Sequence, residues 1–322
     1  MRWVAGATCP PDEPYDADIV ILALDRSAET EAAIASALAQ TGLRRHVVVL
    51  DQGSAPATLA RFAAVIGDRS DITLLAAERN LGVAGGRNLA TSFGHGRAIV
   101  GLDNDAEFAS TTTAADLVAA LDAAPDVAAI GCRIVTYATG EDDLSSWGYP
   151  RALLSRSGDC FDAITFVGAG HAISRTAWDA AGGYDPALFF CWEEFDFCMR
   201  AIALGWRVRY RGDLVVRHKV AAERRVHWSG SRWFHFVRNR LYIGRKHGEG
   251  RMPLLARTCG YLIKGLVNGL ARPTVKAIFE AYRMDGGQRR TGWSAGYIER
   301  HDAVWRGTWL TRLRRDVLVR LR

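Results

Sequence analysis

Two aspartates separated by one residue follow an apolar stretch of the chain. Residues 98–102 are Ala-Ile-Val-Gly-Leu, and Asp103, Asn104 and Asp105 come directly after them. An apolar run without polar alternation predicts a strand that is buried on both faces, and ligands of open α/β sheets bind beyond the carboxyl ends of such strands. Two carboxylates at that place can bind a hard cation such as Mg²⁺ together with phosphate oxygens. The alternative is a plain turn, since Asp-Asn-Asp is also good turn sequence.

A second acidic cluster lies nearly ninety residues further along the chain. Glu193, Glu194 and Asp196 open a predicted helix, beside Trp192 and two phenylalanines. The helix dipole favours acids at this end, which is the purely structural interpretation. A carboxylate walled by aromatic rings loses hydration, so that its pKa rises and it can act as a general base near neutral pH.

Two further candidates for a ligand site follow predicted strands. His218 ends one strand and could reach the same metal ion as the acid pair, although a lone histidine is usually structural. Residues 82–86 are glycine-rich and do not fit the dinucleotide pattern G-x-G-x-x-G. With Arg87 and Asn88 at a helix start, this loop could hold phosphate through backbone N–H groups. A tight turn is the competing interpretation.

The elements that must position these residues alternate between strand and helix, which is typical of βαβ units and a parallel sheet. The polar stretch 140–158 is either a loop over the site or a surface excursion. The expected strands are residues 18–24, 45–50, 71–75, 98–102, 127–131, 167–173, 206–210 and 214–218, and the expected helices include 29–40, 57–65, 113–124, 192–204 and 254–270.

Composition limits the class of protein. A hydrophobic fraction of 49% and 10 Trp indicate a real core and exclude disorder, and 322 residues suffice for one large α/β domain or two moderate ones. The six cysteines form no CxxC pair, so neither a zinc site nor a disulfide scaffold is indicated. With no signal-peptide core near the N-terminus and no apolar run of roughly 18 residues, we expect a cytoplasmic protein.

Charge divides the chain into two parts. Residues 1–220 carry a net charge of −9 and residues 221–322 carry +15, which suggests different partners. Cations and aromatics alternate in 232–242 and again in 305–315, and 254–270 is apolar apart from Arg257 and Lys264. Such segments suit an anionic membrane interface. The alternatives are ordinary packing of helices on the domain and a basic face that binds phosphates.

Taken in order, these motifs resemble those of family 2 inverting glycosyltransferases with the GT-A fold, especially bacterial enzymes similar to rhamnosyl- and galactofuranosyltransferases. The likeness covers about residues 18–245. The matching segments are Asp51-Gln52-Gly53-Ser54 (D-N-G-S in the family), residues 80–88 (N-x-G-x-x-G-G-x-N), Asp103-Asn104-Asp105 (D-x-D), residues 168–185, residues 192–200 (W-E-D-x-D-x-x-x-R), His218 and Arg238-Asn239.

The resemblance implies a GT-A-type Rossmann-like, mostly parallel sheet flanked by helices over residues 18–222, with an N-terminal extension (1–17) and a basic helical C-terminal region (223–322). It also implies transfer of a sugar from a UDP- or dTDP-linked donor, with Mg²⁺ or Mn²⁺, to a glycan or lipid-linked acceptor in cell-surface polysaccharide or glycolipid assembly. Nucleic acid is not an expected partner. Peripheral contact with the inner face of the membrane is expected.

The resemblance also assigns roles to residues. Glu194 stands at the position of the general base, Asp105 and His218 are the expected metal ligands, and Asp103 would meet the ribose or the ion through water. The expected substrate-binding residues are Asp25 and Asp51 for the nucleotide, Gly82, Arg87 and Asn88 for the phosphates, and Asp103, Trp192, Glu193, Asp196 and Arg200 in the remaining pocket.

Two departures from the family pattern stand out. Asp25-Arg26 replaces the usual Tyr-Asn pair, and Glu194 replaces the usual Asp as base, which moves the carboxylate by roughly a bond length. A non-catalytic nucleotide-sugar-binding or membrane-docking module is the alternative from another class. A nucleotidyltransferase is a third, disfavoured because residues 27–40 contain no basic phosphate loop.

Overall fold

The computed structural model describes residues 1–219 and 230–285. The strands of this part are β1 (Arg2–Gly6), β2 (Ala17–Ala23), β3 (Arg45–Asp51), β4 (Ile72–Ala76), β5 (Ala98–Asp103), β6 (Ala106–Phe108), β7 (Val127–Thr136), β8 (Cys160–Ala163), β9 (Gly170–Ser174) and β10 (Arg207–His218). Its helices are α1 (Ser27–Leu38), α2 (Pro56–Ile66), α3 (Gly82–Thr91), α4 (Thr113–Asp122), α5 (Arg175–Ala181), α6 (Glu193–Ala203), α7 (Gly230–Lys246), α8 (Arg251–Val267) and α9 (Ala271–Arg283), with 3₁₀ turns η1 (Arg151–Arg156) and η2 (Pro186–Leu188).

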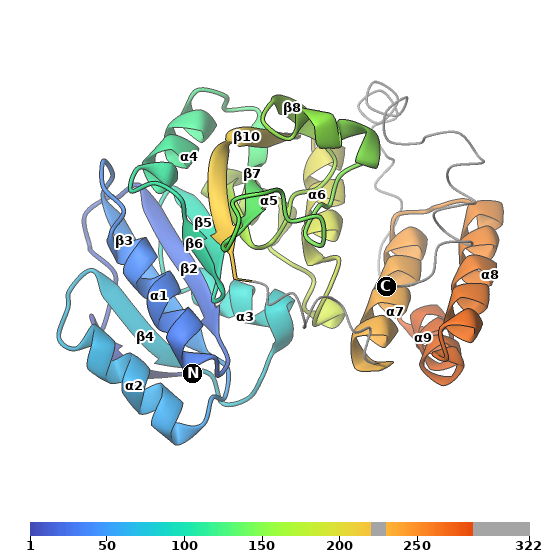
Figure 1. The fold of residues 1–322 in the computed structure, drawn as a ribbon, viewed down its shortest axis with the longest axis horizontal. Helices are drawn as coiled ribbons and strands as arrows, with labels where there is room; N and C mark the ends of the chain where they lie inside the picture. The colour runs from blue at the N-terminus through green and yellow to red at the C-terminus, as the bar shows by residue number, and fades with distance from the viewer. Residues whose placement is uncertain (220–229, 286–322) are drawn as a thin grey trace.

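The strands form one sheet in the order β1-β4-β3-β2-β5-β9-β7-β10-β6, and β8 pairs with β10 off this path. β4, β3, β2 and β5 are parallel to one another, and β9 lies antiparallel between β5 and β7. The expected α/β class, a mostly parallel central sheet flanked by helices, is confirmed (Figure 1).

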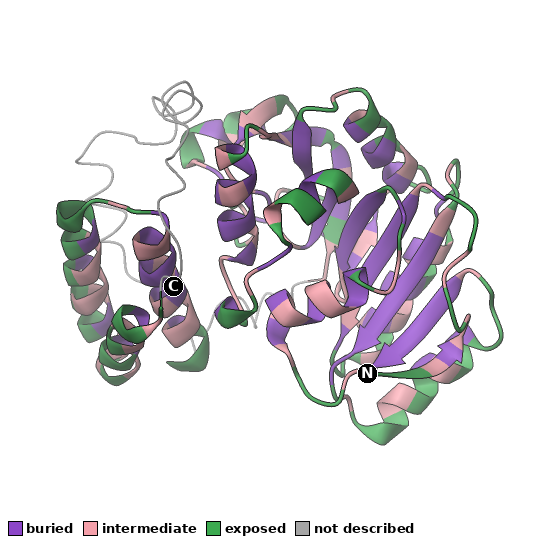
Figure 2. Ribbon diagram, turned by 180° about the vertical axis from the view of Figure 1, so that it is seen from behind, coloured by how far each residue is buried: buried purple, intermediate pink, exposed green. Residues whose placement is uncertain are grey.

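Alternating side chains of the central strands face two separate cores, which is why these strands read as continuous apolar runs. On β2, Ile19 and Ile21 face the core that also contains Ile34 of α1 and Phe62 of α2. Val20 faces the opposite core, where α3, α5 and α6 pack. Both faces of the sheet are therefore covered, and the strands are buried along most of their length (Figure 2).

The structure differs from the expected elements at two places. The segment 1–17, expected to precede the domain as an extension, contributes β1, which pairs antiparallel with β4 at the edge of the sheet. The two strands expected at 206–210 and 214–218 are one strand, β10, with a register irregularity between Arg211 and Val215 where it pairs with β7. A local irregularity of this kind breaks the apolar pattern without ending the strand.

Helices α7, α8 and α9 form a small bundle beside the sheet (Figure 1). Its core contains Trp233, Val237, Leu241, Leu254 and Ala277. The expected helix 254–270 is thus largely α8, and the aromatic and basic segment 232–242 lies within α7. The similar segment 305–315 lies outside the described residues. Across the part of the chain that the structure describes, every helix is too short or too polar to cross a membrane.

Candidate active site

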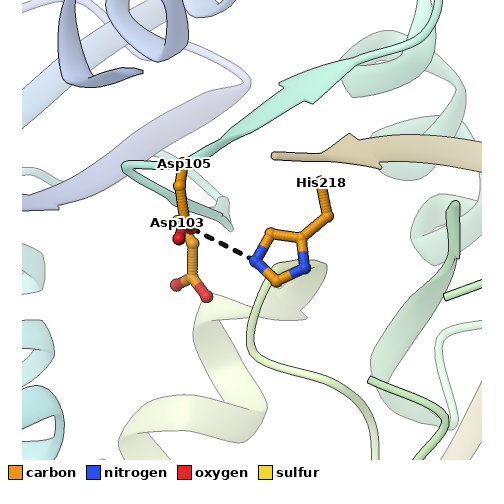
Figure 3. Close-up of side chains that lie close together, drawn as sticks. All are labelled: Asp103, Asp105 and His218. Carbon is orange, nitrogen blue, oxygen red and sulfur yellow. Dashed lines mark hydrogen bonds and ion pairs between the residues drawn. The ribbon is translucent and has the colours of Figure 1, made fainter. Parts of the chain in front are cut away.

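Asp103, Asp105 and His218 meet at one edge of the sheet (Figure 3). Asp103 ends β5, Asp105 lies in the turn before β6, and His218 ends β10. β6 pairs antiparallel with β10 and places Ala106 opposite His218. The Lys219 amide also donates to the Asp105 carbonyl oxygen at 2.7 Å. This pairing brings together residues more than one hundred positions apart, as the sequence leads one to expect.

The three side chains offer a donor set that fits a divalent cation. One atom from each side chain lies within 4.8 Å of the other two. His218 Nε2 and Asp105 Oδ1 are 3.2 Å apart (Figure 3). Two carboxylates and one imidazole provide oxygen-rich ligands of the kind that Mg²⁺ and Mn²⁺ accept. All three side chains are only half-buried, so a substrate phosphate could complete the coordination.

Two arginines approach the acid pair from different sides. Arg26, in the left-handed backbone region at φ 49°, forms an ion pair with Asp105. Arg87 is buried and donates to the Val20 carbonyl oxygen at 2.7 Å and to Asp103 Oδ1 at 2.9 Å. Arg87 therefore links β2 to the acid pair from the buried side and holds the Asp103 carboxylate in place.

His218 is held from both of its ring nitrogens. Asp105 contacts Nε2, and Asp143 Oδ2 lies 3.0 Å from Nδ1. Burial alone would lower the pKa of the His218 imidazole, but these hydrogen bonds raise it to about 10. Asp143 belongs to the polar stretch 140–158, in which the sequence does not distinguish it from its acidic neighbours Glu141 and Asp142. This loop is part of the site.

Glu194, the expected base, has a carboxyl group of raised pKa. Burial raises its pKa to about 7, and the Asp103 carboxylate acts in the same direction. Its Oε1 lies so close to the Cα of Gly168 that a β-carbon there would overlap it. The next residue, Ala169, accepts a hydrogen bond from the Asp103 amide at 3.2 Å. The segment 168–170 therefore connects Glu194 to the acid pair.

Glu193 differs from its neighbour. It is 3% exposed, and its Oε2 atom has no hydrogen-bond partner within residues 1–219 and 230–285. Burial, and then the charge of Glu194, hold the pKa of Glu193 well above its usual range. Burial therefore favours the protonated form of Glu193, and Glu194, with a pKa of about 7, can gain or lose its proton near neutral pH.

The chain enters the helix of these glutamates, α6, through a strained turn that α7 holds in place. Cys191 and Trp192 have positive φ values of 70° and 74°, a region that non-glycine residues rarely occupy. The fully buried Asn239 of α7 donates through Nδ2 to the carbonyl oxygens of Phe190 and Cys191 at 2.8 and 2.9 Å. Trp192 Nε1 donates in turn to the Phe236 carbonyl oxygen at 3.0 Å.

Asp196 contacts the end of α7 rather than the acid pair, and Arg200 pairs with Asp196 and with the backbone carbonyls of Ala181 and Gly183. Asp196 is fully buried and accepts hydrogen bonds from Arg200 Nε at 3.0 Å, from Lys246 Nζ at 3.0 Å and from His247 Nε2 at 2.9 Å. Burial would raise the pKa of Asp196, but these partners lower it. This cluster ties α6 to the end of α7, and substrate contact by either residue stays a prediction.

The expected phosphate loop makes internal contacts. Gly82 has a φ of 71°, and its position permits the Phe189 carbonyl to approach and accept from the Val83 amide at 2.6 Å. Asn88 exchanges hydrogen bonds with the backbone of Tyr184 at 2.8 and 2.9 Å. These N–H groups and side chains hold the fold together, so phosphate binding by Gly82, Arg87 and Asn88 stays a prediction.

The two expected nucleotide-binding aspartates lie at the same edge as the acid pair. Asp51 ends β3 and accepts from the backbone amides of Gly53 and Ser54 at 3.1 and 3.2 Å. Asp25, at φ 52°, accepts from the Ala55 amide at 3.0 Å. Together they fix the loop after β3, and contact of either residue with a nucleotide is untested.

The sequence profile of glycosyl transferase family 2 matches residues 18–179, half of the chain. The match contains β2 to β5, the acid pair and the Gly168 segment. The chain therefore belongs to glycosyl transferase family 2.

Among known proteins, the chain is 41% identical over 98 residues to the succinoglycan biosynthesis protein ExoO of Rhizobium meliloti (strain 1021). That match covers 30% of this chain and only 28% of the relative. Solved structures show the same fold. GalNAc-T7 with UDP, GalNAc and Mn²⁺ superposes with a TM-score of 0.62 at 16% identity, covering 91% of this chain and 58% of that one.

Two other structures are similar over most of their length. The mannosyltransferase PcManGT from Pyrobaculum calidifontis, in complex with GDP-Man and Mn²⁺, has a TM-score of 0.54 at 17% identity, covering 95% of this chain and 84% of that one. S. aureus TarS 1-349 has a TM-score of 0.52 at 13% identity, covering 83% and 89%. At these identities the likeness establishes the GT-A fold alone.

Proposed function

We propose that this protein is a metal-dependent inverting glycosyltransferase, which transfers a sugar from a nucleotide-diphosphate donor to a hydroxyl group of an acceptor. The observation that carries the proposal is the placement of the Asp103–Asp105–His218 cluster and a carboxyl group of raised pKa, Glu194, at one edge of the sheet. A protein that only binds a nucleotide sugar needs no general base such as Glu194 beside the metal site.

Asp105 and His218 would hold the cation, and Asp103 would meet it through water or bind the ribose. When bound, the cation would neutralise the charge that grows on the departing diphosphate. Arg87 keeps the Asp103 carboxylate in place from below, through the 2.9 Å hydrogen bond. Arg26 is paired with Asp105 at the surface and would turn its guanidinium to the donor phosphates.

Glu194 would take the proton of the attacking hydroxyl group. The acceptor oxygen forms a bond to the anomeric carbon while the bond from that carbon to the diphosphate oxygen breaks, so that the nucleoside diphosphate leaves with the electron pair. The proton moves to a Glu194 oxygen. Glu194 would be the one base, whereas Asp103 and Asp105 pair with Arg87 and Arg26 and would face the cation, which favours a single displacement with inversion.

The relatives support a nucleotide-sugar donor and a glycan acceptor. ExoO is a succinoglycan biosynthesis protein, and two of the similar structures hold UDP or GDP-Man with Mn²⁺. We infer a UDP- or dTDP-linked sugar as donor, with Mg²⁺ or Mn²⁺, and a growing glycan or lipid-linked sugar as acceptor in polysaccharide synthesis. Asp25 and Asp51 order the loop on which the nucleotide would lie.

A lipid-linked acceptor would bring the protein to a membrane surface, and α8 and α9 fit an anionic one. They expose large apolar side chains, among them Leu266 at 65% and Phe279 at 59%. The same helices expose Arg251, Arg272 and Arg283. Apolar groups beside cations suit peripheral docking of a cytoplasmic enzyme on anionic lipids.

The proposal is tested with the full chain and a panel of nucleotide-diphosphate sugars. Release of nucleoside diphosphate is measured with Mn²⁺, with Mg²⁺ and with EDTA, first with water and then with glycan acceptors. We expect turnover with one donor class, loss in EDTA and recovery with metal. Binding of a donor without any release would support a non-catalytic module, and full turnover in EDTA would overturn the metal assignment.

A further inference from the structure

The His218 ring lies between two carboxylates that come from different segments. Asp105, in the turn after β5, faces Nε2 at 3.2 Å, and Asp143, after β7, faces Nδ1 at 3.0 Å. The Asp143 side chain is fully buried, whereas Asp105 keeps some exposure. Only Asp105 therefore lies on the open side of the ring, where an ion and a substrate would arrive.

A tight turn holds the Asp143 carboxylate. Its Oδ1 accepts from the Ser145 amide at 3.0 Å and from Ser145 Oγ at 2.6 Å, and its Oδ2 accepts from Ser146 Oγ at 2.7 Å. The Asp143 amide donates to the Ile134 carbonyl oxygen of β7 at 3.0 Å. These hydrogen bonds hold the Asp143 carboxylate in one position relative to β7. The carboxylate can therefore fix the orientation of the His218 imidazole.

We propose that Asp143 is a positioning residue for the metal ligand His218. By accepting from Nδ1–H, Asp143 fixes the tautomer and orientation that present Nε2 to the acid pair, and it makes the imidazole a better electron donor. Carboxylates or carbonyls behind metal-bound histidines act in this way, and their loss typically weakens metal binding 10–100-fold. The inference rests on the proposed function, because it assumes that His218 binds a cation.

A purely structural role for Asp143 is the competing explanation, since the same carboxylate closes the 143–146 turn. Its neighbour Asp142 provides a matched control. Asp142 pairs with Arg133 Nε at 2.6 Å and forms a bridge with Val135, so it also stabilises this loop. It makes no hydrogen bond to His218 within the described residues.

The test compares wild type, Asp143→Ala, Asp143→Asn, Asp142→Asn and His218→Ala as full chains. Free Mn²⁺ is titrated against each protein by EPR, and pulsed EPR measures the coupling of bound Mn²⁺ to the histidine nitrogen. Thermal melting reports folding. We expect Asp143→Ala to weaken Mn²⁺ binding 10–100-fold and to diminish the nitrogen coupling. Asp143→Asn, which keeps an acceptor and the fold, should lie between this variant and wild type, and Asp142→Asn should bind as wild type does.

Two results would overturn the inference, and they can be told apart. If wild type binds Mn²⁺ with a nitrogen coupling and both Asp143 variants bind it within threefold and with the same coupling, Asp143 is structural and the proposed function is untouched. If wild type binds no Mn²⁺, or binds it as His218→Ala does, the metal assignment of the proposed function fails and the role of Asp143 fails with it.

Discussion

Glu194 Oε1 rests against the Cα of Gly168, and a β-carbon at that position would overlap it. We predict that Gly168→Ala displaces the Glu194 carboxylate and lowers the rate of sugar transfer at least tenfold, because small misplacements of a catalytic group are costly. Mn²⁺ binding, measured by EPR titration, should stay unchanged. Gly158→Ala is the control, since a β-carbon there meets nothing within 4 Å. Equal rates for the two variants would contradict the placement of the base.

The pH dependence of transfer should report the raised pKa of Glu194, which is about 7. The base works in its ionised form, so kcat/KM should fall tenfold per pH unit below about 7 and level off above it. The measurement is kcat/KM from pH 5.5 to 8.5 at saturating Mn²⁺, with Mn²⁺ binding checked at each pH. An inflection near the ordinary glutamate value would show that another group limits the rate.

Asn239 should be needed both for stability and for the geometry of the base. Its Nδ2 atom also lies 2.8 Å from the Leu188 carbonyl oxygen, which keeps Arg238 and the Phe190 amide as donors, so Asn239→Ala removes this donor from the part-buried carbonyls of Phe190 and Cys191. We expect a loss of about 1–3 kcal/mol in the free energy of unfolding, measured with urea, and a lower transfer rate. Asn268→Ala, on the partly exposed turn after α8, should change neither. A fully active and stable Asn239→Ala would exclude this role of α7.

Docking of α8 and α9 on lipid should depend on their exposed apolar side chains. Vesicle co-sedimentation at low salt should retain wild type on anionic vesicles and lose the double variant Leu266→Ser/Phe279→Ser. The charge contribution should weaken at 1 M salt, where the Debye length is about 3 Å. Leu144→Ser, which changes a side chain 62% exposed on the 140–158 loop, is the control. If the wild-type protein does not co-sediment with anionic vesicles, the docking prediction is wrong and α8 and α9 only pack within the bundle.

The sequence was sufficient for those parts of the fold that local patterns encode. Successive side chains of β2, β3 and β5 face the two cores in turn. A run of consecutive apolar residues is therefore enough to predict that these strands are buried on both faces. The sequence also indicates that Asp103, Asp105 and His218 could meet, because each residue ends or follows a strand, and in the structure they lie close together. Their function as ligands remains a prediction.

Other parts of the site depend on contacts that no local pattern contains. Asp143 reaches His218 across 75 residues through the pairing of β7 with β10, and Asn239 reaches the turn before α6 only when α7 docks on the domain. Phosphate contact by Arg87 stays a prediction, and the sequence does not indicate that its buried guanidinium donates to the Val20 carbonyl and to Asp103. An arginine that follows several glycines predicts a phosphate loop. Only the tertiary structure shows which oxygen atoms accept hydrogen bonds from that arginine.

The most direct test of the account is the transfer rate of Glu194→Gln. This change keeps the shape of the side chain and removes the proton acceptor, so transfer should fall by roughly 10²–10⁴-fold. Donor and Mn²⁺ affinities should change little, because the base meets the acceptor hydroxyl rather than the diphosphate. Glu193→Gln should be far milder, since burial of Glu193 raises its pKa and favours the neutral form that glutamine resembles. Near-normal turnover of Glu194→Gln, together with an inactive Glu193→Gln or Asp196→Asn, would show that a different carboxylate is the base.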